Sequence, residues 1–66
     1  MNLTINGEMR TIAPVSDLAA LVLQLGLDPR KVAIEQNLEI VPRSAYDRTP
    51  VAEGDRIEIV HFIGGG

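Results

Sequence analysis

The residues best suited to chemistry are the last three of the chain, Gly64, Gly65 and Gly66, which follow a strongly patterned strand. Without a Cβ, such a tail can enter a slot too narrow for other sequences and adopt φ values closed to them. The α-carboxylate that ends it has a reference pKa of about 3.3–3.7 and should be ionised at neutral pH. ATP-dependent adenylation would turn this weak acyl donor into a reactive one. We therefore expect the chain terminus to be the reacting group, and the alternative is an inert, frayed end.

The composition excludes most other kinds of site. With no cysteine and one histidine, the 66 residues provide no catalytic thiol, no disulfide and no thiolate or multi-histidine metal centre. The acidic residues form no cluster with metal or glycosidase spacing, so we expect no catalytic and no metal-binding residue. A net charge of −3 and only two aromatic residues argue against nucleic-acid binding. The N-terminus does not resemble a signal peptide and no apolar run could span a membrane, which predicts a cytoplasmic protein.

The elements that must position the tail form one small domain with a thin, aliphatic core. Residues 2–5 and 8–12 alternate between polar and apolar side chains and predict two strands. Asn6-Gly7 between them predicts a type I′ hairpin turn, which needs a positive φ at both central residues. Pairing across this turn places Leu3 and Ile5 on one face, and Met9 on the other unless a bulge intervenes.

A helix is predicted over residues 17–25. Ser16 or Asp17 can cap its N-terminus, and Gly26 suits the left-handed position that closes a helix. The residue before Pro29 is pushed out of the helical region, which confirms the stop. The apolar face of the helix consists of Leu18, Leu21, Val22 and Leu25, with Leu23 off that face.

Three more strands are predicted after the helix: a central one over residues 32–35, a short edge strand over residues 40–41, and a last one over residues 56–63. Residues 44–47 are typical of the start of a helical turn. The strands on either side of the helix are expected to run parallel, because the connection is long enough for a crossover. The predicted fold is therefore α+β, a mixed four- or five-stranded sheet packed on one helix.

Five short motifs follow one another along the whole chain. They are Asn6-Gly7-Glu8, residues 18–27, Ile40-Val41-Pro42-Arg43, Glu53-Gly54-Asp55 and the terminal Gly65-Gly66. In this order the chain resembles the ubiquitin-like β-grasp sulfur carriers, above all the ThiS family. The resemblance implies a ubiquitin-like β-grasp domain over residues 1–63 and a flexible glycine tail over residues 64–66.

The resemblance also implies a reaction. In that family a ThiF-like, E1-related enzyme uses ATP and magnesium to adenylate the terminal glycine, and a sulfur-donating enzyme then converts it to a thiocarboxylate. The thiazole synthase ThiG accepts this sulfur for the thiazole of thiamine. By this resemblance Gly66 is the covalent carrier, and Gly64 and Gly65 let the tail thread. The chain is then a protein cosubstrate rather than an enzyme, without a bound cofactor and monomeric when free.

The last strand also predicts a docking surface. Alternation places Ile57, Ile59 and His61 on one face and Val60 and Phe62 on the other. The resemblance implies that partner enzymes dock on the second face, whereas scattered exposed apolar residues are otherwise ordinary.

Arg43 is a candidate to pair with acidic groups of a partner, and His61 is expected to lie at the rim without chemistry. Two alternatives remain open. One is a MoaD-like carrier for molybdopterin synthesis with the same tail chemistry. The other is a non-covalent ubiquitin-like binding module whose glycines are inert.

Overall fold

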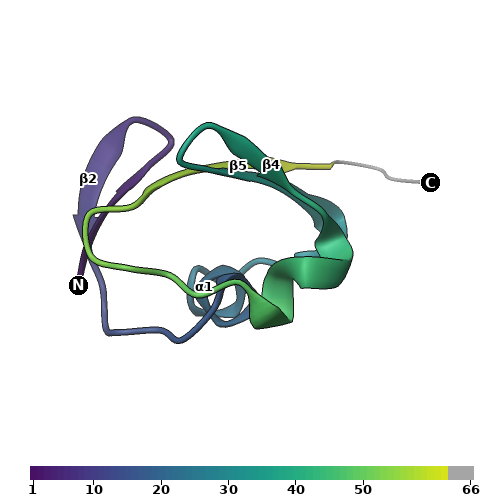
Figure 1. The fold of residues 1–66 in the computed structure, drawn as a ribbon, viewed down its shortest axis with the longest axis horizontal. Coiled ribbons are helices and arrows are strands. Elements are labelled where there is room, and N and C mark those ends of the chain that lie inside the picture. Colours follow the sequence, from purple (N-terminus) through teal and green to yellow (C-terminus); the bar gives the residue numbers. More distant parts are fainter. Residues whose placement is uncertain (63–66) are drawn as a thin grey trace.

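The computed structural model describes residues 1–62. A five-stranded sheet forms one layer, and a single α-helix crosses one of its faces (Figure 1). The elements in chain order are β1 (Asn2–Ile5), β2 (Glu8–Thr11), α1 (Leu18–Gln24), the 3₁₀ helix η1 (Pro29–Lys31), β3 (Val32–Gln36), β4 (Glu39–Val41), the 3₁₀ helix η2 (Arg43–Arg48) and β5 (Arg56–His61). The α+β prediction is confirmed, and of the two strand numbers allowed, five is the correct one.

The predicted hairpin between β1 and β2 is present. Asn6 has a φ of 51° and Gly7 a φ of 82°, as a type I′ turn requires. The turn pairs Ile5 with Glu8 and sets Met9 opposite Thr4, so Met9 lies on the open face of the sheet. No bulge is needed, and β2 ends one residue earlier than predicted.

The helix lies where its caps predict. Of the two candidate N-caps, Asp17 is the one used, and its carboxylate accepts a hydrogen bond from the Ala20 N–H at 2.8 Å. At the other end Gly26 has a φ of 81°. The N–H of Gly26 donates to the Leu23 C=O and the N–H of Leu27 donates to the Val22 C=O, both at 3.0 Å, which together form a Schellman motif.

The sheet order is β2-β1-β5-β3-β4, and this order corrects the prediction that β3 is the central strand. β3 has a neighbour on each side, but the middle position belongs to β5. The strands that flank the helix, β2 and β3, run in the same direction, as predicted, but they are not neighbours, and the hydrogen-bonded parallel pair is β1 with β5. The physical reason is that the crossover through α1 leads from the edge strand β2 to β3 and leaves a gap of two strand positions, which β1 and the last strand fill.

The core lies between the sheet and α1. It is aliphatic as predicted, except for Tyr46 of η2, whose hydroxyl donates a hydrogen bond to the Val32 C=O at 3.1 Å. The predicted helical turn over residues 44–47 is part of η2. The buried side chains are Leu3, Ile5, Leu18, Leu21, Val22, Val32, Ile34, Tyr46, Val51, Ile57 and Ile59.

The last strand was predicted to run to residue 63, and the described part of it ends at His61. Residues 63–66 lie outside the described residues. The boundary between a domain over residues 1–63 and a tail over residues 64–66 therefore stays a prediction. Among residues 1–62, no helix is long and apolar enough to cross a membrane.

Candidate functional site: the end of β5

β5 separates its two faces as the alternation predicts. Ile57 is fully buried and Ile59 is 8% exposed, whereas Val60 and Phe62 are 61% and 44% exposed on the opposite face. β5 thus packs one row of side chains against the core and presents the other to solvent.

The backbone of β5 is held on the side of β3 up to its last described residues. β3 pairs antiparallel with it as far as Val32 opposite His61. One residue further on, the Phe62 N–H donates to the Lys31 C=O at 2.8 Å. An anchored peptide group therefore lies four residues before Gly66 in the sequence.

On the other side of β5, the side chain of Asn6 continues the hydrogen bonding beyond the point where the pairing with β1 ends. The parallel pairing with β1 ends at Ile5 opposite Ile57. Beyond it, the Asn6 side-chain Oδ1 accepts from the Ile59 N–H at 2.8 Å and its Nδ2 donates to the Ile59 C=O at 3.2 Å. The amide side chain thus supplies the hydrogen bonds that the next peptide of β1 would have made.

A second turn asparagine binds the beginning of β5. Asn37 follows β3 with a φ of 51°, and its Oδ1 accepts from the Arg56 N–H at 2.9 Å. Its backbone N–H donates to the Arg56 C=O at 2.8 Å. Sequence analysis missed both asparagine contacts. The available signal was an asparagine in each of the two hairpin turns that flank β5.

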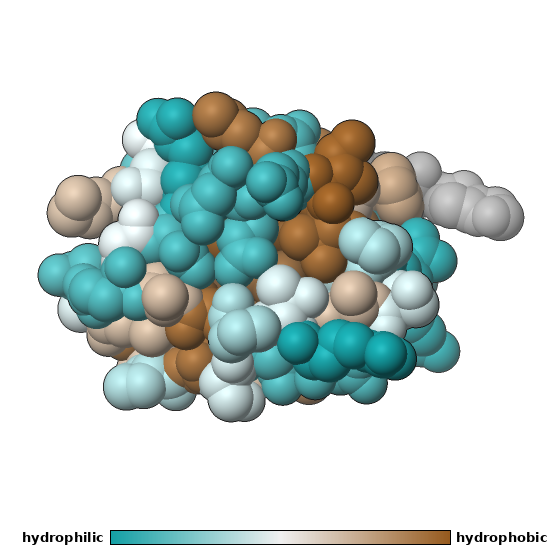
Figure 2. Space-filling view, viewed as in Figure 1, coloured by the Kyte–Doolittle hydropathy of each residue, from teal (hydrophilic) through white to brown (hydrophobic). Residues whose placement is uncertain are grey.

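The open face of the sheet carries several exposed apolar side chains. Strand pairing places Val60 opposite Ala33, and Ile40 of β4 opposite Glu35. Ile40 is 82% exposed, and it was not among the predicted docking residues. Figure 2 shows hydrophobic surface over β4, interrupted by hydrophilic side chains. Val60 and Phe62 therefore belong to a broader apolar surface that is interspersed with charges.

Arg43, the third predicted docking residue, lies in a different place. It begins η2, which packs against α1 on the other side of the sheet. There it lines a hollow of about 270 Å³ together with Ala19, Arg30 and Tyr46. The structure therefore brings Val60 and Phe62 together on the open face and separates Arg43 from them. The docking roles of all three stay predictions.

Charged groups gather around this end of the sheet. The Arg30 guanidinium pairs with the Asp28 carboxylate at 2.9 Å. Hydrogen bonds from the side chain and the backbone of Arg30 lower the pKa of Asp28 to about 2. Arg48 and Asp47 approach each other only to 3.9 Å.

His61 is exposed at the end of β5, as expected for a rim residue. Within residues 1–62, no three or more His, Cys, Asp or Glu side chains are arranged to hold a metal ion.

The middle position of β5 between β1 and β3, with one helix across the sheet, defines the class: a ubiquitin-like β-grasp protein. The ThiS family model matches residues 3–66, and the chain belongs to the ThiS family. The structure resembles the crystal structure of the thiamine biosynthesis protein ThiS from Geobacter metallireducens, with a TM-score of 0.82, 36% identity and complete coverage of both chains.

Two curated relatives differ in the share of their length that the chain covers. It is 54% identical over its whole length to 20% of a thiazole synthase from Paramagnetospirillum magneticum. It is 42% identical over 40 residues, 61% of each chain, to the sulfur carrier protein ThiS of Bacillus subtilis. The chain spans about a fifth of the length of the thiazole synthases that it matches.

Proposed function

We propose that this chain carries sulfur for thiamine biosynthesis as a thiocarboxylate on Gly66. The observation that carries the proposal is a match to the ThiS family that extends through Gly66, on a chain whose β5 is anchored up to Phe62. Four residues in extended form span at most about 14 Å. The reacting group thus lies within this distance of the anchored Phe62 peptide.

The absence of cysteine defines how sulfur can be carried. Without a thiol, the chain cannot hold sulfur as a persulfide, so the bond must be to a carbonyl carbon. This chemistry requires a free α-carboxylate on Gly66, whether the chain ends there or is released there from a longer one.

The proposed chemistry has two steps. The Gly66 carboxylate attacks the α-phosphorus of ATP and forms an acyl adenylate, with pyrophosphate as the leaving group. Sulfur delivered by a donor enzyme at the oxidation level of hydrosulfide then attacks the carbonyl carbon, the C–O bond to AMP breaks, and AMP leaves the thiocarboxylate on Gly66. The chain itself supplies only the carboxylate and its position, so it acts as a protein cosubstrate. ATP and magnesium belong to the partner enzyme, and because adenylation needs ATP, we propose a cytoplasmic location.

Three partners follow from this proposal. A ThiF-like, E1-related enzyme adenylates Gly66, a sulfur-donating enzyme supplies the sulfur, and a thiazole synthase of the ThiG type accepts it. The relatives that are themselves thiazole synthases support the last of these, since they contain a segment like this chain. Gly64 and Gly65 are proposed to thread into the active site of each partner, and Val60, Phe62 and Arg43 to contact it.

ATP–pyrophosphate exchange with the cognate adenylating enzyme tests the first step. The enzyme and magnesium are mixed with ATP, labelled pyrophosphate and the chain. Label is expected to enter ATP only when the chain is present. Exchange at the same rate without the chain, or none with it, would contradict the proposal and favour a non-covalent binding module.

A further inference from the structure

Four of the six lysine and arginine residues lie at the end of the sheet where β5 finishes. The Lys31 C=O accepts a hydrogen bond from the Phe62 N–H, and Arg30 precedes Lys31 in η1. Arg43 and Arg48 begin and end η2, which packs against η1. We call this group the basic end, defined as Arg30, Lys31, Arg43 and Arg48.

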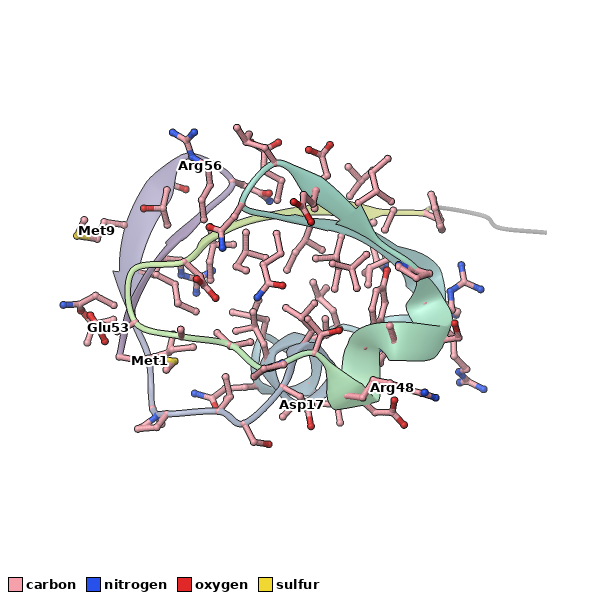
Figure 3. All side chains as sticks on the ribbon, viewed as in Figure 1. Met1, Met9, Asp17, Arg48, Glu53 and Arg56 are labelled. Atoms are coloured by element: carbon pink, nitrogen blue, oxygen red, sulfur yellow. The ribbon has the colours of Figure 1, made fainter. Side chains whose placement is uncertain are left out.

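The charge of the basic end opposes that of the rest of the chain. Two carboxylates, Asp28 and Asp47, accompany its four cations, which leaves a local charge of +2. The remaining residues hold seven of the nine acidic side chains and two arginines, Arg10 and Arg56, a charge of −5. Figure 3 shows Arg48 on the opposite side of the molecule from Arg56 and Glu53.

Two of these cations have no ion-pair partner within residues 1–62. Arg30 is engaged by Asp28, and Arg48 is near Asp47. Lys31 and Arg43 make no salt bridge among the described residues, and both are exposed. These two side chains are therefore the ones whose charge is available to a partner.

We propose that the basic end binds an acidic surface on the adenylating enzyme and guides the chain so that β5 points at its active site. The inference rests on the proposed function. Charge complementarity mainly accelerates association and fixes orientation, because long-range attraction acts before contact. Because the basic end is positive and the rest of the chain is negative, an acidic surface attracts the basic end and orients the chain before contact.

The hollow beside Arg43 specifies the kind of contact. It lies between α1, η1 and η2, and its wall includes Arg43, Ser44 and the Asp47 carboxylate, together with Arg30, whose guanidinium is paired with Asp28. With Arg30 paired to Asp28, the Arg43 guanidinium and the Ser44 hydroxyl are the donors that remain for a partner's carboxylate, which accepts charge-assisted hydrogen bonds from such groups. A glutamate or aspartate side chain of the enzyme fits this position.

A protein surface explains the basic end better than a nucleic acid does. The four cations are interspersed with two carboxylates, which would repel a continuous phosphate backbone. Phe62 is the only exposed aromatic side chain in the described region, so no stacking platform is available for bases. Binding to nucleic acid is therefore the competing outcome that the test must detect.

The test compares two double variants with the same net charge. Lys31→Glu with Arg43→Glu alters the basic end, and Arg10→Glu with Arg56→Glu alters the rest of the surface. Each replaces two positive charges by two negative ones and moves the net charge from −3 to −7. Circular dichroism and thermal unfolding check that both variants fold like the wild type.

Association with the adenylating enzyme is followed by stopped-flow fluorescence at several salt concentrations. At low salt the basic-end variant is expected to associate about 10-fold or more slowly than the wild type, a difference that salt should remove. The control variant is expected to slow much less. Equal slowing of the two variants, or no slowing of either, would overturn the proposal, as would wild-type binding to single-stranded DNA that is lost in the basic-end variant.

Pyrophosphate exchange at saturating chain separates this inference from the proposed function. If the wild type supports exchange and the two variants associate alike, only the role of the basic end is wrong. If the wild type neither binds the enzyme nor supports exchange, both the proposed function and this inference are wrong.

Discussion

The side-chain amide of Asn6 makes two hydrogen bonds with the backbone of Ile59, 53 residues later in the chain. The same residue takes the positive φ of the first hairpin turn. One asparagine therefore forms the turn between β1 and β2 and extends the contact of β1 with β5 towards the reactive end. This dual role makes Asn6 a sensitive test of how β5 is held.

Replacing Asn6 by glycine separates the two roles, because glycine keeps the positive φ and removes the amide. Two hydrogen bonds are lost, each with a net contribution of about 0.5–1.5 kcal/mol, so Asn6→Gly should lower the free energy of unfolding by about 1–3 kcal/mol. Urea unfolding measures this loss, and amide exchange should accelerate most at Ile59. Unchanged stability together with unchanged exchange at Ile59 would show that the contact contributes nothing.

Helix α1 offers a matched pair of positions for testing the core. Leu21 is fully buried and Leu23, two residues later, is 64% exposed. Leu21→Ala should destabilise the protein by about 2–5 kcal/mol, because it removes buried methyl groups and leaves a cavity. Leu23→Ala should change stability by less than about 0.5 kcal/mol. Denaturant melts of the two variants check this, and similar losses would mean that the assigned helix face is wrong.

The sequence predicted those elements whose signals are local. Asn6-Gly7 determined the first turn, Asp17 and Gly26 determined the ends of α1, and the alternation of β5 identified its buried row. Each depends on the φ preference, capping group or side-chain period of a few neighbouring residues.

The order of the strands could not be predicted in the same way. Nothing in residues 56–61 indicates that they lie between β1 and β3. The pairing of β1 with β5 joins segments more than 50 residues apart. The Asn6–Ile59 contact and the gathering of cations from η1 and η2 depend on that long-range arrangement. Arg43 was named from its neighbours in sequence, and only the fold shows that it lies apart from Val60 and Phe62.

The open face of the sheet should contribute to binding without contributing to folding. Phe62→Ala removes a half-exposed ring at the end of β5 and is expected to weaken the complex with the adenylating enzyme while leaving thermal unfolding nearly unchanged. Met9→Ala is the control, since Met9 is exposed on the same face but on the edge strand β2. Calorimetric titration compares the affinities, and an equal effect of both substitutions would contradict docking at the end of β5.

The Asp28–Arg30 pair predicts a pH dependence at the acidic end of the scale. Because Arg30 lowers the folded-state pKa of Asp28 to about 2 from 3.8, the pair stabilises the protein above pH 4, and this contribution disappears as the pH falls through 2. Carboxyl NMR titration should give this low pKa for the wild type. In Arg30→Gln the pKa should rise towards its ordinary value, and an unchanged titration would show that Arg30 is not the cause.

The central claim is that sulfur is carried by Gly66. Removing Gly66 shortens the tail by about 3.3–3.6 Å, whereas reactive geometry tolerates displacements of only about 1 Å. The shortened chain should therefore fold and bind the adenylating enzyme but fail to react. Adding one alanine after Gly66 should have the same effect, because it displaces the carboxylate and introduces a methyl group.

The most direct measurement is the intact mass of the chain after incubation with ATP, magnesium, the adenylating enzyme and a sulfur donor, followed by fragmentation of the C-terminal peptide. The wild type is expected to gain the mass difference of one oxygen replaced by one sulfur, located on Gly66, and the shortened and extended chains are expected to gain none. Sulfur on any other residue, or its appearance at the wild-type rate in either altered chain, would contradict the claim.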